Sequence, residues 1–340
     1  MNHTVYGIDI AKSVFQLHTV DMTTGEIVSI KLKREKFLAH FINLPPCLIG
    51  MEACGGAQHW ARELIKLGHQ VKLLAGKYVK SFVMGNKSDT ADAKAIWTAV
   101  QQPGIKPIAI KTEQQQAILA LHRLRQGLVK TRTMQINALR GLLTEYGFVM
   151  PKGKAGLRRD IATTLESLRL RLPSIVVDAL TDQWQRINEQ DKQIAEIEHK
   201  LHIWLKQDKA AQAIAKIPGV GLLTATVAVA AMGDTKTFKS GREFAAWAGL
   251  VPKQTGTGGK TKLLGISKRG DTYLRTLLIH GARAVLTHAK QPSQWIKEIG
   301  QRRPPNVVIV ALANKMARTI WAILAHDRPY RSDWVSVKPA

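Results

Sequence analysis

Residues 4–32, TVYGIDIAKSVFQLHTVDMTTGEIVSIKL, decide the fold of the N-terminal part of the chain. Three short β-prone runs follow one another here, at 4–10, 14–20 and 27–32, and the residues between them are polar or turn-forming. Short runs joined by tight connections usually pair with their neighbours in sequence. The stretch therefore predicts a meander of three strands at the start of the chain.

After this stretch the pattern changes to helices that alternate with strands. A helical stretch at 36–42 precedes an apolar strand at 47–51, and a helix at 57–67 precedes a fifth strand at 70–74. Three antiparallel strands followed by alternating helices and strands is the order of a ribonuclease-H-like α/β fold. We expect residues 1–105 to form such a domain, with acidic residues at the centre of its sheet.

Four acidic residues stand out in this region because acids are scarce, with 25 Asp and Glu against 50 Lys and Arg in the whole chain. Asp9 and Glu52 each end an apolar strand, where a charge is costly unless a cation or hydrogen bonds compensate it. Asp89 and Asp92 are three residues apart, so both fall on one face of a helix. Acids in the first turn of a helix also occur without any catalytic role, because they favour the helix dipole. In combination with Asp9 and Glu52 they favour a site for a hard cation such as Mg²⁺, which supports phosphoryl transfer.

The composition of the chain points to a phosphate-rich partner. Its net charge is +25 and its sequence pI is about 10.2, as expected of a nucleic-acid binder. A hydrophobic content of 45% excludes a disordered basic tail, and a length of 340 residues suggests two or three domains. We expect no membrane span or signal peptide. Cys47 and Cys54 lack metal-ligand or redox spacing, which is typical of a cytoplasmic protein.

Residues 106–206 are predicted to form long helices. Apolar residues recur at helical spacing between Glu113 and Glu145. After Pro173, heptad a and d positions from Val177 to Leu201 resemble a short coiled coil, which either joins protomers or packs within one chain. The basic residues of this region that are candidates for phosphate contacts are Arg123, Arg132, Arg140, Lys152, Arg158 and Arg159.

Residues 207–340 are predicted to be mainly helical and to open with a helix-hairpin-helix. The motif is Ile-Pro-Gly-Val-Gly at 217–221, followed by a helix-forming run of small residues. Gly219 and Gly221 permit a tight turn and expose backbone N–H groups to a DNA phosphate. An ordinary turn between two helices is the alternative interpretation.

A glycine-rich basic loop follows a compact apolar helix. Its Gly-Gly-Lys-Thr invites comparison with a nucleotide-binding phosphate loop, but the first glycine of that pattern would fall at Gln254. What remains is a flexible loop in which the hydroxyls of Thr255 and Thr257 are either turn formers or nucleophiles. The candidate nucleic-acid contacts in and after the loop are Lys260, Lys262, Lys268 and Arg269.

Six motifs, taken in order, resemble the DEDD-type insertion-sequence transposases, whose N-terminal domain is similar to Holliday-junction resolvases. The resemblance covers nearly the whole chain. The motifs are Gly-Ile-Asp-Ile-Ala-Lys at 7–12, Met-Glu-Ala at 51–53, Lys-Ser-Asp-Thr-Ala-Asp-Ala at 87–93, Ile-Pro-Gly-Val-Gly at 217–221, Phe-Ala-Ala-Trp-Ala-Gly-Leu-Val-Pro at 244–252 and Gly-Ile-Ser-Lys-Arg-Gly-Asp at 265–271.

The resemblance implies an enzyme that cleaves and rejoins donor and target DNA. It implies that Asp9, Glu52, Asp89 and Asp92 are a tetrad that binds Mg²⁺. It also implies a C-terminal transposase domain whose active-site hydroxyl completes the site from another protomer, and hence a homo-oligomer, either a dimer or a tetramer. A structured bridge RNA encoded by the element would pair with both DNAs, and the protein would act at the prokaryotic nucleoid.

The chain departs from the family in the loop before Gly-Gly-Lys, where the family typically carries a serine. Counting forward from Pro252 puts Thr257 in that place; Thr255 is the second candidate, and Ser267, in a separate motif, is the third. Two other functions compete with a recombinase. In a resolvase-like nuclease the tetrad would activate water, but such an enzyme would not need the long helical middle or the third domain. A non-catalytic nucleic-acid scaffold leaves the four acids unexplained.

Overall fold

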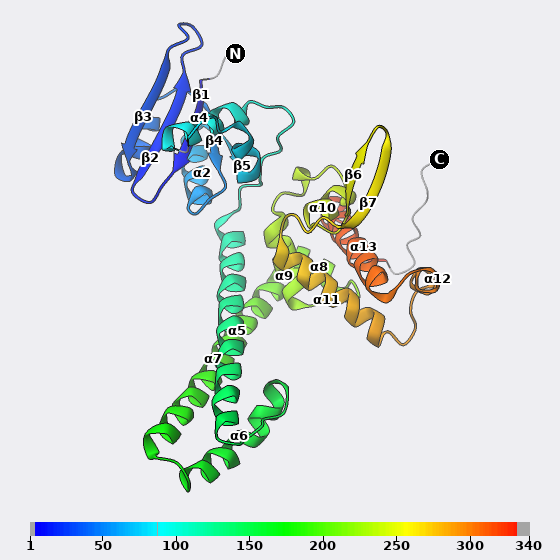
Figure 1. Cartoon of the computed structure of the whole chain (residues 1–340). Helices are drawn as coiled ribbons and strands as arrows, with labels where there is room; N and C mark the ends of the chain where they lie inside the picture. The colour runs from blue at the N-terminus through cyan, green and yellow to red at the C-terminus, as the bar shows by residue number, and fades with distance from the viewer. Residues whose placement is uncertain (1–3, 87, 332–340) are drawn as a thin grey trace. The chain divides into compact units, whose positions relative to one another are not determined.

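The computed structural model describes residues 4–86 and 88–331, which fall into two compact units. Unit 1 runs to Thr112 and includes Met232–Thr237, and the remaining described residues form unit 2 (Figure 1). The first boundary therefore lies seven residues beyond the one expected at 105. The long helices of the middle region and the C-terminal helices belong to the same compact unit.

Unit 1 is built on one five-stranded sheet with the strand order β3-β2-β1-β4-β5. The first three strands are antiparallel, and β4 and β5 run parallel to β1. The predicted meander and the two later strands are confirmed, in the order expected of a ribonuclease-H-like fold. The strands are β1 (Val5–Ile10), β2 (Val14–Val20), β3 (Ile27–Lys33), β4 (Leu48–Glu52) and β5 (Gln70–Leu74).

Helices cover both faces of this sheet. Alternation along β1 puts Ile8 in an aromatic core with Phe15 and Trp60, whereas Gly7 faces the opposite side, against α4. The core side is covered by α1 and α2, and α4 crosses β1, β2 and β4 on the other side. The helices of unit 1 are η1 (Arg34–Lys36), α1 (Phe37–Ile42), α2 (Ala57–Lys66), α3 (Gly76–Val79), η2 (Lys80–Phe82), α4 (Asp89–Val100) and η3 (Thr235–Thr237).

Unit 2 contains a long helical arm. The helices α5 (Glu113–Glu145) and α7 (Ser174–Gln207) pack along each other, and α6 (Gly153–Arg169) packs on α7. The heptad positions predicted in the first half of α7 lie in one cluster with α5 and α6, so this part of the seam is covered within the chain. Leu201, near the end of α7, packs in a separate cluster with Ile118 of α5. The buried residues of this seam include Ile136, Leu139 and Leu143 of α5 and Val177, Leu180 and Ile187 of α7.

The C-terminal part of unit 2 is organised around α13 (Pro305–His326), which packs against α8, α10, α11 and α12. By length and composition α13 is long and apolar enough to cross a membrane, whereas the sequence was expected to contain no such segment. One side of it is buried within unit 2, at Leu312, Met316 and Ile320, so it serves as a core helix. The remaining elements are α8 (Lys209–Ala215), α9 (Leu222–Met232), α10 (Gly241–Trp247), β6 (Pro252–Thr257), β7 (Lys260–Ile266), α11 (Thr272–His288) and α12 (Gln294–Arg302).

His122 on α5 joins the arm to two of the C-terminal helices. Its ring nitrogens lie 2.9 Å from Thr226 Oγ1 on α9 and 3.2 Å from Tyr273 Oη on α11. Burial lowers the pKa of His122 to about 4, and the positive charge of Arg125 adds to this effect. The imidazole is therefore neutral near pH 7 and acts as a buried hydrogen-bonding bridge.

We expect His122 to make the stability of unit 2 depend on pH. Between the ordinary pKa of 6.5 and the folded value of about 4, the unfolded chain binds a proton that the folded chain does not. The free energy of unfolding therefore falls as pH drops through this window, by on the order of 2–3 kcal/mol. Urea unfolding near pH 7 and near pH 4.5 measures it, and His122→Gln should remove this contribution.

Exposed His199 on α7 provides the matched control. His199→Gln should keep the pH dependence of the wild type. Equal pH dependence in the wild type and in His122→Gln would contradict the assignment.

Candidate active site

Asp9 and Glu52 lie next to each other at the carboxyl ends of two parallel strands. In the register of β1 and β4, Ile8 is opposite Met51, so Asp9, the last residue but one of β1, lies beside Glu52, the last residue of β4. Side chains alternate along a strand, and Gly7, two residues before Asp9, faces α4. The two carboxylates therefore lie on the face of the sheet that carries α4.

Asp89 and Asp92 lie in the first turn of α4, as the sequence predicted. Ser88 begins this helix as its N-cap, and its hydroxyl oxygen accepts a hydrogen bond of 3.2 Å from the Ala91 N–H. The cap fixes where the helix starts, and hence which residues occupy the turn nearest its N-terminus.

Two glycines in the strands let α4 approach the sheet closely. A Cβ at Gly7 would lie 2.6 Å from Trp97 Cβ, and one at Gly50 would lie 2.7 Å from Val100 Cβ. Any larger residue at either position would push the helix outward. Neither role could be predicted from the sequence, because a glycine within a strand does not reveal which element covers it.

The other three carboxylates are close enough to Asp9 to act on it. The pKa of Asp9 is raised, first by burial and then by neighbouring negative charges. These charges belong to Asp92, Asp89 and Glu52. The thiol of Cys54 also reports on this site, since burial and then the charges of Glu52 and Asp9 raise its pKa. The fold thus brings together the four acids that the sequence singled out.

The donor set is suited to a hard divalent cation. All four groups are carboxylates, and no Lys or Arg of the described chain forms an ion pair with any of them. Repulsion among such carboxylates is relieved when a cation binds. As they stand, no three His, Cys, Asp or Glu side chains within residues 4–86 and 88–331 are grouped tightly enough to hold an ion. Binding a metal therefore requires the carboxylates to draw together.

A polar row beside Asp9 was also missed from the sequence. Gln16 of β2 is directly opposite Asp9, and Lys31 of β3 is directly opposite Gln16, so the three share one face of the sheet. The Gln16 amide donates a hydrogen bond of 2.9 Å to Ser29 Oγ. Strand periodicity assigns these residues to a face, but only the register places them beside the acid.

The candidate hydroxyls lie on a β-hairpin, and the expectation of a flexible loop is wrong. Strands β6 and β7 form an antiparallel ribbon, and every residue of β6 is exposed. Gly258 and Gly259 turn the chain with φ of 56° and 79°. Two glycines between β-prone runs are a strong signal for such a turn, and Gly258-Gly259 could have predicted the hairpin from the sequence.

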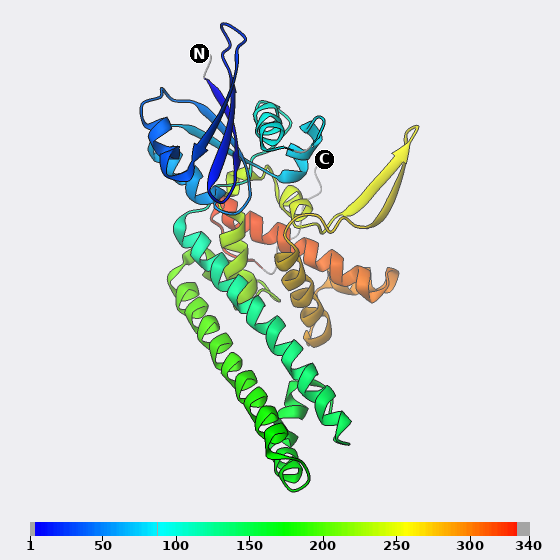
Figure 2. The ribbon, with the colours of Figure 1, turned by 60° about the vertical axis from the view of Figure 1, so that its left-hand side comes forward.

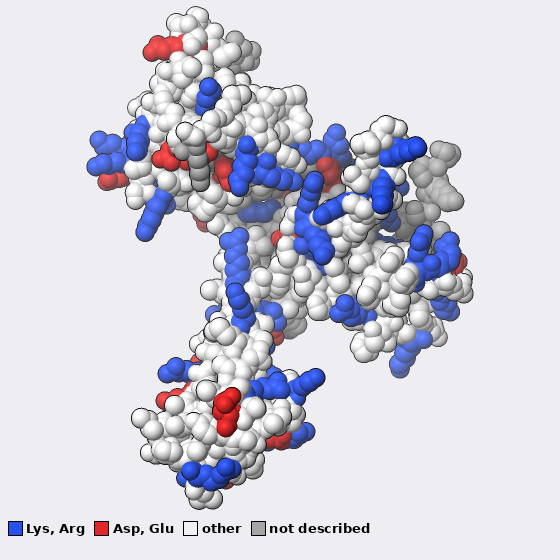
Figure 3. Space-filling view, viewed as in Figure 1, with Lys and Arg blue, Asp and Glu red and all other residues white. Residues whose placement is uncertain are grey.

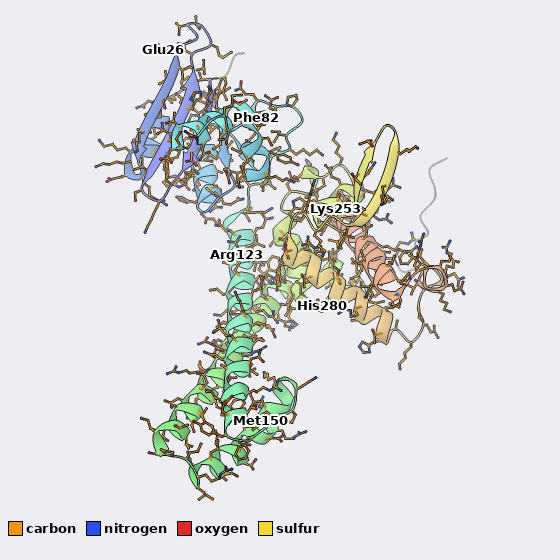
Figure 4. All side chains as sticks on the ribbon, viewed as in Figure 1. Glu26, Phe82, Arg123, Met150, Lys253 and His280 are labelled. Atoms are coloured by element: carbon orange, nitrogen blue, oxygen red, sulfur yellow. The ribbon has the colours of Figure 1, made fainter. Side chains whose placement is uncertain are left out.

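The register of this hairpin pairs each candidate threonine with a lysine. Thr257 is opposite Lys260, and Thr255 is opposite Lys262, so the two hydroxyls and two ammonium groups share one face of the ribbon. Figure 2 shows the hairpin reaching away from the helices of unit 2, and Figure 4 labels Lys253 on β6. Exposed hydroxyls beside cations suit contact with a phosphate.

Ser267, the third candidate nucleophile, lies at the base of the hairpin. Its N–H donates a hydrogen bond of 2.8 Å to the Val251 carbonyl oxygen, while its hydroxyl oxygen is buried without a partner among the described residues. A buried hydroxyl is poorly placed to attack a DNA strand, which supports its low rank. Arg275 donates a bond of 3.1 Å to the carbonyl oxygen of Arg269, and this turn leaves the side chains of Lys268 and Arg269 exposed.

Gly219 and Gly221 lie in the turn between α8 and α9. Gly219 has a φ of 84°, and a Cβ there would lie 2.7 Å from the Gly281 carbonyl oxygen on α11. Gly221 is exposed, and a Cβ there would meet no atom within 4 Å. Close packing therefore explains Gly219, and the contact of this turn with DNA stays a prediction.

Two of the basic residues predicted to bind nucleic acid are engaged inside the arm. Arg132 forms an ion pair of 2.6 Å with Asp191, which also binds Lys154 at 2.7 Å. Arg140 donates a hydrogen bond of 3.0 Å to the Met150 carbonyl oxygen. Sequence spacing gave no sign of these partners, because they lie on other helices or loops.

The other basic residues named in the arm are exposed. They are Arg123 on α5, Lys152 before α6, and Arg158 and Arg159 on α6. Arg159 forms an ion pair of 2.7 Å with Asp160. Figure 3 shows Lys and Arg side chains spread over unit 2, and Figure 4 labels Arg123 on the arm.

We expect Arg158 and Arg159 to contribute to salt-dependent binding of nucleic acid. Replacing both with Gln should flatten the slope of log affinity against log salt by about one unit or more, because fewer counterions are released. Fluorescence anisotropy over a salt series measures the slope. Arg158→Gln alone should account for most of the change, since Asp160 partly offsets Arg159.

A matched control removes two other surface charges. Lys66→Gln with Lys192→Gln changes the net charge equally, and both lysines already have a carboxylate partner. The control should leave the slope unchanged. Equal slopes in the arginine variant and the wild type would mean that this face of α6 does not contact nucleic acid.

Comparison with known proteins shows the family of the chain. The family model of the DEDD transposases of the IS110 type matches residues 6–148, and the model "Transposase IS116/IS110/IS902 family" matches residues 211–297. A probable family 20 transposase of Pseudomonas aeruginosa is 43% identical, covering 97% of this chain and 99% of the relative. The transposase of insertion sequence IS1111A from Coxiella burnetii is 40% identical, over 96% of this chain and 91% of that protein.

A third relative, the transposase of insertion sequence IS1328 from Yersinia enterocolitica, is 40% identical over 95% of this chain and 97% of its own length. The two family models together include the acidic tetrad and the threonine hairpin. From the matched models, the full-length relatives and the fold, the chain belongs to the IS110 family of insertion-sequence transposases.

Proposed function

We propose that this transposase cleaves and rejoins donor and target DNA by metal-assisted phosphoryl transfer through a threonine hydroxyl. The observation that carries the proposal is the convergence of four acids, Asp9 and Glu52 from adjacent strands with Asp89 and Asp92 from the first turn of α4. Burial, and then the charges of the other three acids, raises the pKa of Asp9. A cluster of carboxylates that has no ion pair with a described Lys or Arg is unfavourable unless it binds a ligand of opposite charge. A divalent cation at a phosphodiester is such a ligand.

Each member of the tetrad has a role set by its element. Asp9 and Glu52 come from the rigid sheet, and Asp89 and Asp92 come from the capped first turn of α4. Together they would hold Mg²⁺, which supplies charge neutralisation at the phosphate and makes a hydroxyl easier to deprotonate. Gln16 and Lys31 continue the row on the sheet and would bind the phosphates of the DNA strand next to the scissile one.

The covalent step exchanges one phosphodiester for another. The Thr257 oxygen forms a bond to phosphorus, the bond from phosphorus to one deoxyribose oxygen breaks, and that oxygen leaves as a hydroxyl carrying the proton that threonine gave up. One phosphate ester replaces another, so the energy of the broken bond is kept in the link to threonine. Attack on that link by the hydroxyl of a different strand then rejoins the DNA and releases the threonine. Lys260, directly opposite Thr257, would stabilise the charge that develops on the phosphate.

The partners of the reaction follow from charge and from the family resemblance. A net charge of +25 and exposed arginines on the arm support contacts with a structured bridge RNA as well as with DNA. We also propose a homo-oligomer, a dimer or tetramer, in which the hydroxyl of one protomer serves the tetrad of another. Such a complex would act on chromosomal DNA in the cytoplasm of a prokaryote.

The experiment that tests this function uses end-labelled DNA carrying the element's ends, the RNA transcribed from its noncoding flank, and Mg²⁺. A labelled DNA strand that migrates with the protein after denaturation is the expected product, together with a free hydroxyl end. Strand cleavage that leaves no label on the protein would instead support the resolvase-like nuclease, in which water attacks. No cleavage with Mg²⁺ present would reject both.

A further inference from the structure

The side chain of Glu52 lies against a residue that has no side chain. Strand β4 pairs with β5 so that Glu52 is opposite Leu74, the last residue of β5. Gly76, two residues further on, is the first residue of α3. The register therefore brings the carboxylate of Glu52 to the start of this short helix.

The space next to Gly76 is filled by Glu52. A Cβ at Gly76 would overlap Glu52 Oε1, and it would lie 3.0 Å from Cδ and 3.5 Å from Oε2. All three of its nearest neighbours belong to this one side chain. A methyl group at position 76 and the present position of the carboxylate are therefore mutually exclusive.

The backbone does not require glycine at this position. Gly76 is not among the glycines with positive φ, and it is the first residue of a helical turn. Alanine fits this conformation and favours a helix more than glycine does. The contact with Glu52 is thus the feature of the structure that accounts for a glycine here.

We propose that Gly76 is a positioning residue for Glu52, and that its missing side chain leaves the space from which the carboxylate joins Asp9, Asp89 and Asp92. This inference rests on the proposed function, because it assumes that Glu52 binds the metal. Gly76 itself touches neither metal nor DNA and acts only through Glu52.

The test is a Gly76→Ala variant of the full chain, with Mn²⁺ as the probe and electron paramagnetic resonance of unbound Mn²⁺ as the measurement. Displacing the carboxylate should weaken Mn²⁺ binding by about 10–100-fold, as for other changes that reorient a metal ligand. The melting temperature should stay unchanged or rise slightly, because alanine favours the helix. A residue that served only the fold would show the opposite pattern.

Two other glycines of unit 1 provide matched controls. Gly55 lies three residues after Glu52, and Gly104 follows α4; a Cβ at either would meet no atom within 4 Å, and neither has positive φ. Gly55→Ala and Gly104→Ala should bind Mn²⁺ as the wild type does.

A double-mutant cycle identifies Glu52 as the partner. Glu52→Asp shortens the side chain by one methylene and removes the clash, although it binds metal less well than the wild type. Adding Gly76→Ala to Glu52→Asp should weaken Mn²⁺ binding by less than about threefold, compared with the 10–100-fold loss in the wild-type background. If Gly76→Ala alone fails to fold, recovery in the double variant of both folding and the Mn²⁺ binding of Glu52→Asp supports the proposal.

The outcomes separate this inference from the function on which it rests. If Gly76→Ala binds Mn²⁺ as tightly as the wild type while Glu52→Gln loses binding, the positioning role of Gly76 is overturned and the metal site stands. Wild-type binding in Glu52→Gln overturns the metal site itself. Gly76 would serve only the fold if Gly76→Ala weakened Mn²⁺ binding equally in the wild type and in Glu52→Asp. The same would follow if Gly76→Ala failed to fold and Glu52→Asp did not restore folding.

Discussion

Replacing Glu52 with Gln should lower DNA strand cleavage by about 10²–10³-fold or more, because the amide keeps the shape of the side chain and removes its charge. Glu52 ends β4 beside Asp9, and its charge acts on Asp9 and on Cys54. Affinity for DNA and RNA should persist, since basic residues elsewhere supply it. Cleavage of end-labelled DNA in Mg²⁺, compared with anisotropy binding curves, measures both quantities.

Glu63→Gln is the control for this prediction. Glu63 lies on α2 in the same unit, and its partner is Lys66 at 2.8 Å rather than the tetrad. This variant should cleave at the wild-type rate. Undiminished cleavage by Glu52→Gln would remove Glu52 from the catalytic site.

Replacing Thr257 with Ala should abolish the covalent link between protein and DNA, as well as recombination. Thr257 is exposed on β6 opposite Lys260, next to the Gly258-Gly259 turn. Alanine removes the attacking oxygen, whereas Thr257→Ser keeps it and should retain both activities. Denaturing gels of labelled DNA detect the link, and mass spectrometry of the adduct identifies the residue.

Thr255→Ala is the matched control, because Thr255 lies on the same face of the ribbon opposite Lys262. It should still form the link. Loss of the link in Thr255→Ala but not in Thr257→Ala would move the nucleophile two residues toward the N-terminus. A link that survives both changes would direct attention to Ser267, and cleavage without any link would favour water.

The sheet of unit 1 could be predicted because its signals are local. Short β-prone runs and the turn at 23–26 define the meander, and Asp9 near the end of β1 and Glu52 at the end of β4 are visible as charges after apolar runs. The first turn of α4 was likewise accessible, since Asp89 and Asp92 are three residues apart and therefore share one face of a helix. All four acids of the proposed tetrad could therefore be named from the sequence before the pairing of the strands was known.

What the sequence did not reveal depends on pairing between distant segments. The close approach of Gly76 to Glu52 requires the register of β4 with β5, and the place of Lys31 beside Gln16 requires that of β2 with β3. The ion pair of Arg132 with Asp191 similarly joins two helices of the arm. Local periodicity assigns a residue to a face but does not name its neighbour.

The measurement that tests the account most directly is Mn²⁺ binding to the full chain and to four single variants, Asp9→Asn, Glu52→Gln, Asp89→Asn and Asp92→Asn. Electron paramagnetic resonance gives the number of ions bound and their affinity. We predict that each substitution weakens binding by at least about tenfold, because in the proposed site all four carboxylates share the cation. Mn²⁺ binding of wild-type strength in all four variants would contradict the account.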